Sequence, residues 1–194
     1  MADLAAVVAA AMARLECGPE TTVLGNGLGA FVALTLAIRH GDKFGPLIAS
    51  NVGASFPMER KGAFTTMGQL AEKGGMPAVA DIAIQRIFPP VYSSANPAAL
   101  EERRAVLESI SPEVFAGVCR ALAALDLVDD LDKIDNATLV IAGAIDQTTP
   151  PEMGREVVDA ISNARMVMIP ECGHCPQLEQ PEALLQGIDE FLES

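Results

Sequence analysis

The sequence predicts an α/β protein, in which a parallel β-sheet with crossover helices is interrupted by a helical insertion. Three observations support this prediction. Short β-favouring runs alternate with helical patterns toward both ends of the chain, glycine-rich turns join strands to helices, and the middle contains helical patterns only. With 194 residues, the chain is long enough to bury one hydrophobic core and short for two independent ones.

The first part of the chain alternates between helix and strand. Its opening residues are rich in alanine, with apolar side chains at helical spacing, and Gly18 with Pro19 ends that pattern. The predicted elements are, in order, a helix over 2–15, a strand over 21–24, a helix over about 28–40 and a strand over 46–50. This alternation is typical of a parallel sheet.

The middle of the chain changes character, because no convincing strand interrupts it. Its helical patterns cover residues 59–72, 76–88, 97–109 and 112–126. The remaining elements are strands over 138–142 and 165–169 and helices that begin near Pro150 and Pro181. We therefore predict a core formed by residues 1–55 and 136–194, and a helical cap over residues 56–135.

Charge and composition exclude several classes of protein. Thirteen basic and 26 acidic residues give a net charge of −13, which repels a phosphate backbone and an anionic membrane surface, so we expect neither as a partner. Asp3 stands where a signal peptide has basic residues, and no apolar run approaches the roughly 20 residues of a membrane span. We expect a cytoplasmic protein whose four cysteines are reduced thiols.

The turn from Gly25 to Ala30 has three interpretations. As G-x-G-x-x-A it fits a dinucleotide fingerprint, but that motif requires an acidic residue about 20 positions on, and the next strand ends in Ser50 and Asn51. As G-x-S-x-G it is a nucleophile elbow with Gly27 in place of the serine. It is also an ordinary tight turn between strand and helix.

Two further motifs directly follow predicted strands. Asp146 is placed to orient a histidine, or to cap the helix near Pro150, although Thr148 or Thr149 stands closer to that capping position. His174 lies between Cys172 and Cys175 in a C-x-x-C pattern. A redox dithiol is disfavoured because a thioredoxin-like fold needs strands after this motif, and a metal site lacks a second ligand pair. We expect no cofactor and no metal.

The order of these motifs resembles the α/β-hydrolase family, where the elbow is followed by an acid and then a histidine. The resemblance is to its 3-oxoadipate enol-lactonase branch, and it rests on three stretches: GNGLGAFVALTLAIRHG, SPEVFAGVCRALAALDLVDDLDKIDNATLVIAGAIDQTTPPE and IPECGHCPQLEQPEALLQGIDEFL. It implies an α/β-hydrolase-like parallel sheet with a helical cap. It also implies that Asp146 is the triad acid, His174 the general base and the Leu28 amide an oxyanion-hole donor.

The chain departs from this family in two places. Gly27 has no side chain, so an acyl-enzyme cannot form there, and the resemblance implies weak or lost activity on small carboxylic esters or lactones. Water activated by His174 is the remaining hydrolytic route. The alternatives are a non-catalytic oligomeric or small-molecule-binding protein on a hydrolase scaffold, and a dinucleotide-binding protein.

The second departure is at the front of the chain, where family members have several strands before this point. Either the sequence is a truncated form, or the protein functions with half a sheet. About 20 residues precede the glycine-rich turn, so the strand from Thr21 to Leu24 is expected to lie at an edge of a truncated sheet. A bare apolar edge invites pairing with another chain. We therefore expect a two-fold homodimer that joins this strand to its own copy.

Overall fold

The computed structural model describes residues 1–193 and divides into two compact units. The sheet unit contains residues 1–55 and the chain from Asp126 onward, and the helical unit is Phe56–Leu125. The second boundary falls earlier than the predicted residue 136. The backbone N–H of Leu127 donates to Ala54 O at 2.9 Å, and Ile134 is fully buried, so this segment belongs to the sheet unit.

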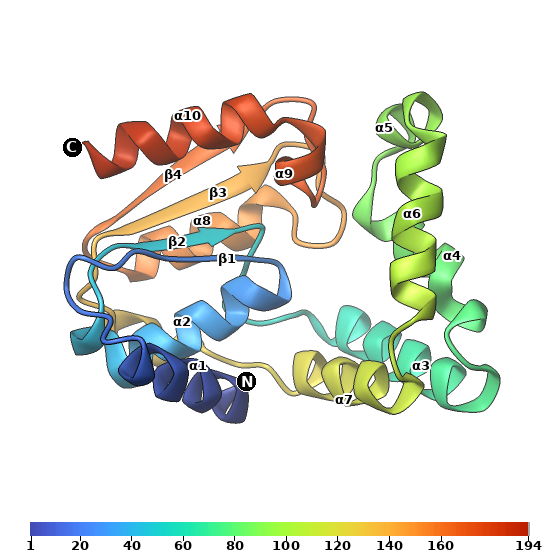
Figure 1. Cartoon of the computed structure of the whole chain (residues 1–194), viewed down its shortest axis with the longest axis horizontal. Coiled ribbons are helices and arrows are strands. Elements are labelled where there is room, and N and C mark those ends of the chain that lie inside the picture. The colour runs from blue at the N-terminus through green and yellow to red at the C-terminus, as the bar shows by residue number, and fades with distance from the viewer. Residues whose placement is uncertain (194) are drawn as a thin grey trace. The chain divides into compact units, whose positions relative to one another are not determined.

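The sheet unit is built on four parallel strands in the order β1-β2-β3-β4 (Figure 1). The strands are β1 (Val23–Asn26), β2 (Leu47–Ser50), β3 (Thr138–Gly143) and β4 (Ala164–Ile169). This confirms the predicted α/β class, with the first strand two residues later than the sequence suggested. The shift arises because Thr21 is held in a turn, where its N–H donates to Gly18 O and its carbonyl accepts from Gly45.

Helices cover both faces of the sheet, as crossover connections require. Val140 of β3 faces α8, where it packs beside Gly154, while its neighbours Leu139 and Ile141 face α10. The helices of this unit are α1 (Ala2–Arg14), α2 (Leu28–His40), α8 (Pro151–Ala160), α9 (Pro176–Glu179) and α10 (Pro181–Leu192). Two 3-10 helices, η1 (Gly41–Lys43) and η2 (Val128–Lys133), complete it.

The helical unit contains five helices, one more than the sequence predicted. They are α3 (Met58–Gly74), α4 (Pro77–Ile87), α5 (Pro90–Ala95), α6 (Pro97–Glu108) and α7 (Pro112–Ala123). Its core includes Ala71, Met76 and Val79, with Phe115 packed against them. The additional helix, α5, is six residues long and begins at a proline, so it carries too little periodicity to be read from sequence. In the described part of the chain, no helix is long and apolar enough to cross a membrane.

Candidate active site

The loops that follow the four strands bring the predicted site residues together. Because parallel strands share a direction, their carboxyl ends meet at one edge of the sheet, where ligands of open α/β sheets bind. In Figure 1 the arrowheads of β2 and β3 point to the side on which α9 lies. Asp146 follows β3 and His174 follows β4, and Asp146 Oδ2 lies 2.7 Å from His174 Nδ1.

The Asp146 carboxylate is buried, with its side chain fully excluded from solvent. Its Oδ2 accepts from Asn51 Nδ2 and from the Thr149 hydroxyl, each at 2.7 Å, besides facing His174. Its Oδ1 accepts from the backbone N–H groups of Thr148 and Thr149 at 2.7 and 3.2 Å. Five donors therefore converge on one carboxylate.

These partners decide the protonation state of Asp146. Burial by itself raises the pKa of this carboxyl group, but the hydrogen bond and charge of His174, with the hydrogen bonds of Asn51 and Thr149, outweigh it. The pKa of Asp146 consequently lies below its ordinary value. An ionised Asp146 accepts a hydrogen bond from a proton on Nδ1, and in that tautomer the lone pair of the imidazole lies on Nε2.

Gly27 lies directly in front of His174 Nε2. It separates β1 from α2 and has φ +53°, in the left-handed region that glycine adopts without strain. A Cβ built on Gly27 would lie 2.8 Å from His174 Nε2. The imidazole therefore approaches the backbone at the place where a nucleophile's side chain would begin.

The Leu28 amide, for which the resemblance predicts the role of an oxyanion-hole donor, directly follows Gly27. Leu28 is the first residue of α2, so its N–H is among those that have no partner within the helix. Gly25 makes this tight turn possible, because a Cβ there would lie 2.3 Å from Gly29 O. The helix N-terminus adds a partial positive charge next to Gly27.

A second close approach joins the loop after β3 to the loop after β4. A Cβ on Gly143 would lie 2.0 Å from Gly173 O, and the N–H of Ile145 donates to Cys172 O at 3.0 Å. On the other side of the histidine loop, Glu179 accepts from the backbone N–H groups of Gly173 and Cys175 at 2.7 and 2.8 Å. His174 is thus fixed by its neighbours' backbone as well as by Asp146.

Three polar residues of this site were not predicted from the sequence. Asn51 and Thr149 bond Asp146, and Glu179 holds the histidine loop. Asn51 was noted only because an acid is missing at the end of its strand, and Thr149 only as a possible helix cap. The available signal for Asn51 was its place directly after a strand, since polar residues there gather at one sheet edge.

The two cysteines around His174 are both buried. Burial, together with the nearby Glu179, Asp146 and Cys175, raises the pKa of the Cys172 thiol to about 12. Redox thiols need a lowered pKa. Among the described residues no disulfide joins any of the cysteines, and no cluster of three potential metal ligands is present.

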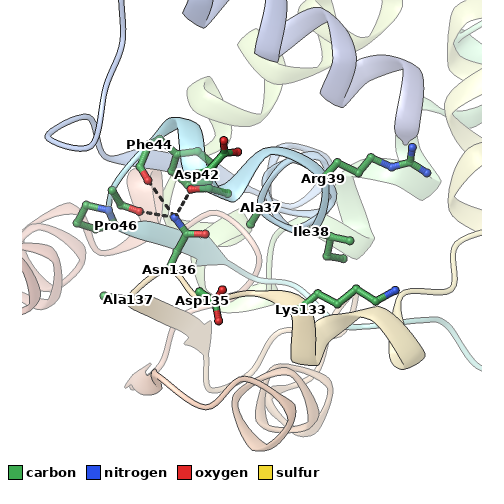
Figure 2. Close-up of a pocket in the computed structure, with 12 residues that line it drawn as sticks. Ala37, Ile38, Arg39, Asp42, Phe44, Pro46, Lys133, Asp135, Asn136 and Ala137 are labelled. Atoms are coloured by element: carbon green, nitrogen blue, oxygen red, sulfur yellow. Dashed lines mark hydrogen bonds between the residues drawn. The ribbon is translucent and has the colours of Figure 1, made fainter.

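A pocket of about 530 Å³ lies away from these loops, at the amino ends of β2 and β3 (Figure 2). Its polar centre is Asn136, whose Nδ2 donates to Gly41 O, Phe44 O and Gly45 O at 3.0, 3.1 and 2.8 Å. Arg39 and Lys133 extend away from Asn136 in Figure 2. Asn136 closes the turn before β2.

The parallel sheet, the elbow-like turn and the Asp146–His174 pair are together characteristic of one family. Residues 1–186 match the alpha/beta hydrolase family, and the chain belongs to it.

The relatives of this chain include an enol-lactonase and a semialdehyde hydrolase. The chain is 29% identical over 171 residues to 3-oxoadipate enol-lactonase 2 of Acinetobacter baylyi, covering 88% of this chain and 63% of that protein. It is 29% identical over 178 residues to 2-hydroxymuconate semialdehyde hydrolase of Pseudomonas putida, covering 88% of this chain and 61% of that protein. The chain therefore spans less than two thirds of either relative.

The solved structures agree with this assignment. The enol-lactonase from Burkholderia xenovorans LB400 superposes with a TM-score of 0.91 at 27% sequence identity, covering 98% of this chain and 72% of that one. The predicted α/β-hydrolase-like sheet and the predicted likeness to enol-lactonases are confirmed. The catalytic roles of Asp146, His174, Gly27 and Leu28 stay predictions.

Proposed function

We propose that this chain binds small carboxylic esters or lactones of the enol-lactone type, and that its hydrolytic activity on them is weak because Gly27 carries no nucleophile. The observation that carries this proposal is the 2.7 Å contact between Asp146 Oδ2 and His174 Nδ1, with Nε2 directed at Gly27. The enol-lactonases among its relatives supply the substrate class.

The residues present support direct attack by water. His174 Nε2 takes a proton from water as the water oxygen adds to the substrate carbonyl carbon, and the Leu28 N–H donates to the resulting oxyanion. Collapse of this intermediate breaks the ester C–O bond, and Nε2–H returns the proton to the leaving alcohol or enol. Serine hydrolases without their triad retain about 10³- to 10⁴-fold acceleration over water, which sets an upper range for this route.

The competing function is non-catalytic binding of a small molecule on the hydrolase scaffold. It is favoured by the approach of His174 Nε2 to Gly27, which places the imidazole 2.8 Å from the position of a side-chain carbon there. Such a site keeps its polar framework without the group that attacks the substrate.

Hydrolysis of 4-nitrophenyl acetate and of an enol-lactone tests the proposal in four proteins: wild type, His174→Ala, Gly27→Ser and Gly27→Ala. We expect slow turnover by wild type that His174→Ala abolishes. Gly27→Ser is expected to gain rate and to accumulate an acetyl adduct by mass spectrometry. Gly27→Ala is the matched control, since it adds the same Cβ without the hydroxyl.

Each result separates the two functions. Wild-type turnover that depends on His174 supports hydrolysis by activated water, and a rate gain confined to Gly27→Ser shows that the pocket still binds and orients an ester. If none of the four proteins turns over either substrate, the hydrolase proposal fails and the binding function replaces it.

A further inference from the structure

A buried carboxamide links the loops after three of the four strands. Asn51, which follows β2, is fully buried. Its Nδ2 donates to Asp146 Oδ2 at 2.7 Å in the loop after β3, and to Gly173 O at 3.0 Å in the loop after β4. One side chain therefore contacts the acid of the site and the backbone next to His174.

The orientation of this carboxamide is determined by its partners. The Ser50 hydroxyl donates to Asn51 Oδ1 at 2.9 Å, and both N–H bonds of Nδ2 are used by Asp146 and Gly173. A flipped amide would point its oxygen at a carboxylate and a carbonyl, which are both acceptors. Only one orientation satisfies every group.

The network returns to the residue before Gly27. Asn26 Nδ2 lies 3.4 Å from Ser50 Oγ and donates to His174 O at 3.2 Å. Hydrogen bonds thus run from Asn26 through Ser50, Asn51 and Asp146 to His174, and back to Asn26 through the His174 carbonyl.

The backbone of Asn51 is held in an unusual conformation. Its φ is +54°, which costs an L-residue energy and is tolerated best by glycine, asparagine and aspartate. The N–H of Asn51 donates to Ile141 O at 2.7 Å, so sheet pairing maintains this geometry. Non-glycine residues in this region concentrate at functional sites.

We propose that Asn51 is a positioning residue for the Asp146–His174 pair. Its amide group fixes which oxygen of Asp146 faces the imidazole, which holds the proton on Nδ1 and leaves Nε2 as the base toward Gly27. This role rests on the proposed function, because it matters only if His174 acts as a base. The order of strands and helices in the sequence does not reveal this role of Asn51.

The groups that face Asp146 define what a titration will report. His174 contacts Oδ2 from the loop after β4, and the Cys172 thiol of the same loop interacts electrostatically with Asp146. From the end of β2 and from its own loop, Asp146 meets uncharged donors, which are the Asn51 amide, the Thr149 hydroxyl and the backbone N–H groups of Thr148 and Thr149. Asn51 is thus the position at which a charge can be added with little change in shape.

NMR titration of isotope-labelled protein tests this role without requiring turnover. In Asn51→Asp a carboxylate oxygen replaces the donor 2.7 Å from Asp146 Oδ2, and repulsion between like charges is expected to raise the pKa of Asp146 by at least about one unit, a tenfold change in proton affinity. Asn51→Gly keeps the left-handed backbone accessible and removes the amide. For Asn51→Gly we expect the ring ¹⁵N chemical shifts of His174 to move from those of the Nδ1–H tautomer toward those of a mixture of the two tautomers.

Matched controls separate positioning from folding. Asn136→Asp alters another amide of the sheet unit, one that donates to three carbonyls at the opposite edge, and is expected to leave Asp146 and His174 as in wild type. His40 serves as an internal reference for the ring shifts. If Asn51→Asp does not fold, Ser50→Ala provides the milder test, because it frees Asn51 Oδ1 and keeps the backbone.

The outcomes are distinct from those of the hydrolase proposal. A wild-type tautomer of His174 and an unchanged Asp146 titration in folded Asn51→Gly would overturn the positioning role, whatever the activity. Altered tautomer and titration in a protein without turnover would leave Asn51 as the positioning residue and contradict only the proposed function.

Discussion

Asp146 couples the stability of the site to pH. Its pKa is lowered in the folded protein, so its contribution to the free energy of unfolding is fully present above the unfolded-state value, about 3.9. That contribution is lost as the pH falls through the lower pKa of the folded state. The same carboxylate therefore orients His174 and makes the fold sensitive to acid.

We expect the stability difference between wild type and Asp146→Asn to be constant above about pH 5 and to shrink on acidification. Urea unfolding from pH 6 to pH 2.5 measures it. The exposed Asp159→Asn variant is the control, and it should follow wild type across the range. A difference that widens as the pH falls would contradict the direction of the Asp146 shift.

Gly27 and His174 should be coupled energetically. Gly27→Ala is expected to lower the free energy of unfolding by about 1–3 kcal/mol, because its left-handed φ strains any L-residue and its Cβ would lie 2.8 Å from Nε2. In a His174→Ala background the crowding disappears and only the strain remains. Urea unfolding of the two single variants and the double variant measures the coupling, and strict additivity would contradict the close approach.

At the scale of elements, the turn between β1 and α2 requires glycine at one position and not at another. A Cβ on Gly25 would lie 2.3 Å from Gly29 O, whereas one on Gly29 would meet nothing within 4 Å. We expect Gly25→Ala to destabilise the protein by about 2 kcal/mol or more, and Gly29→Ala to stabilise it by about 0.5–1 kcal/mol. Thermal unfolding of the pair checks this, and equal effects would show that the turn adapts.

Elements with a strong local pattern could be predicted from sequence. The prediction of α2 agrees at both ends, since Gly27 precedes it and Gly41 follows it. The four-residue α9 could not be predicted, because its carboxylate Glu179 acts on backbone groups of a loop that only tertiary folding places nearby. The predicted range of strand β1 began too early, because the turn at Thr21 depends on a hydrogen bond from Gly45, more than 20 residues later.

The part of the candidate site that follows from the order of the motifs could be predicted from the sequence. Asp146 and His174 follow successive strands, and parallel topology alone brings such residues to one edge. Asn51 follows the same rule, yet its role depends on an amide orientation set by Ser50 and on a φ of +54°, neither of which leaves a pattern in the sequence.

At the scale of the whole molecule, the edge of the sheet at β1 favours the association of two copies, whereas the overall charge opposes it. Strand β1 pairs with β2 on one side, and Leu24 is 52% exposed. A second copy, added antiparallel along β1 with two-fold symmetry, would extend the sheet. A net charge of −13 on each chain opposes that association at low ionic strength.

We therefore predict a dimer that strengthens with salt, because screening weakens the repulsion between copies. Light scattering coupled to size exclusion at about 0.05 and 0.5 M salt measures it, and Leu24→Lys is expected to shift the equilibrium to monomer. Val7→Lys, at an exposed apolar residue of α1, is the matched control. A folded monomer at both salt concentrations would contradict the prediction.

The geometry at Gly27 also bears on how such a protein changes over evolution. A glycine that relieves left-handed strain and admits an approaching imidazole makes the fold easier to maintain. A serine at this position would introduce backbone strain and would require the ring of His174 to move at the same time. A side chain at this turn is therefore kept only where the function it adds outweighs the backbone strain and the displacement of the ring.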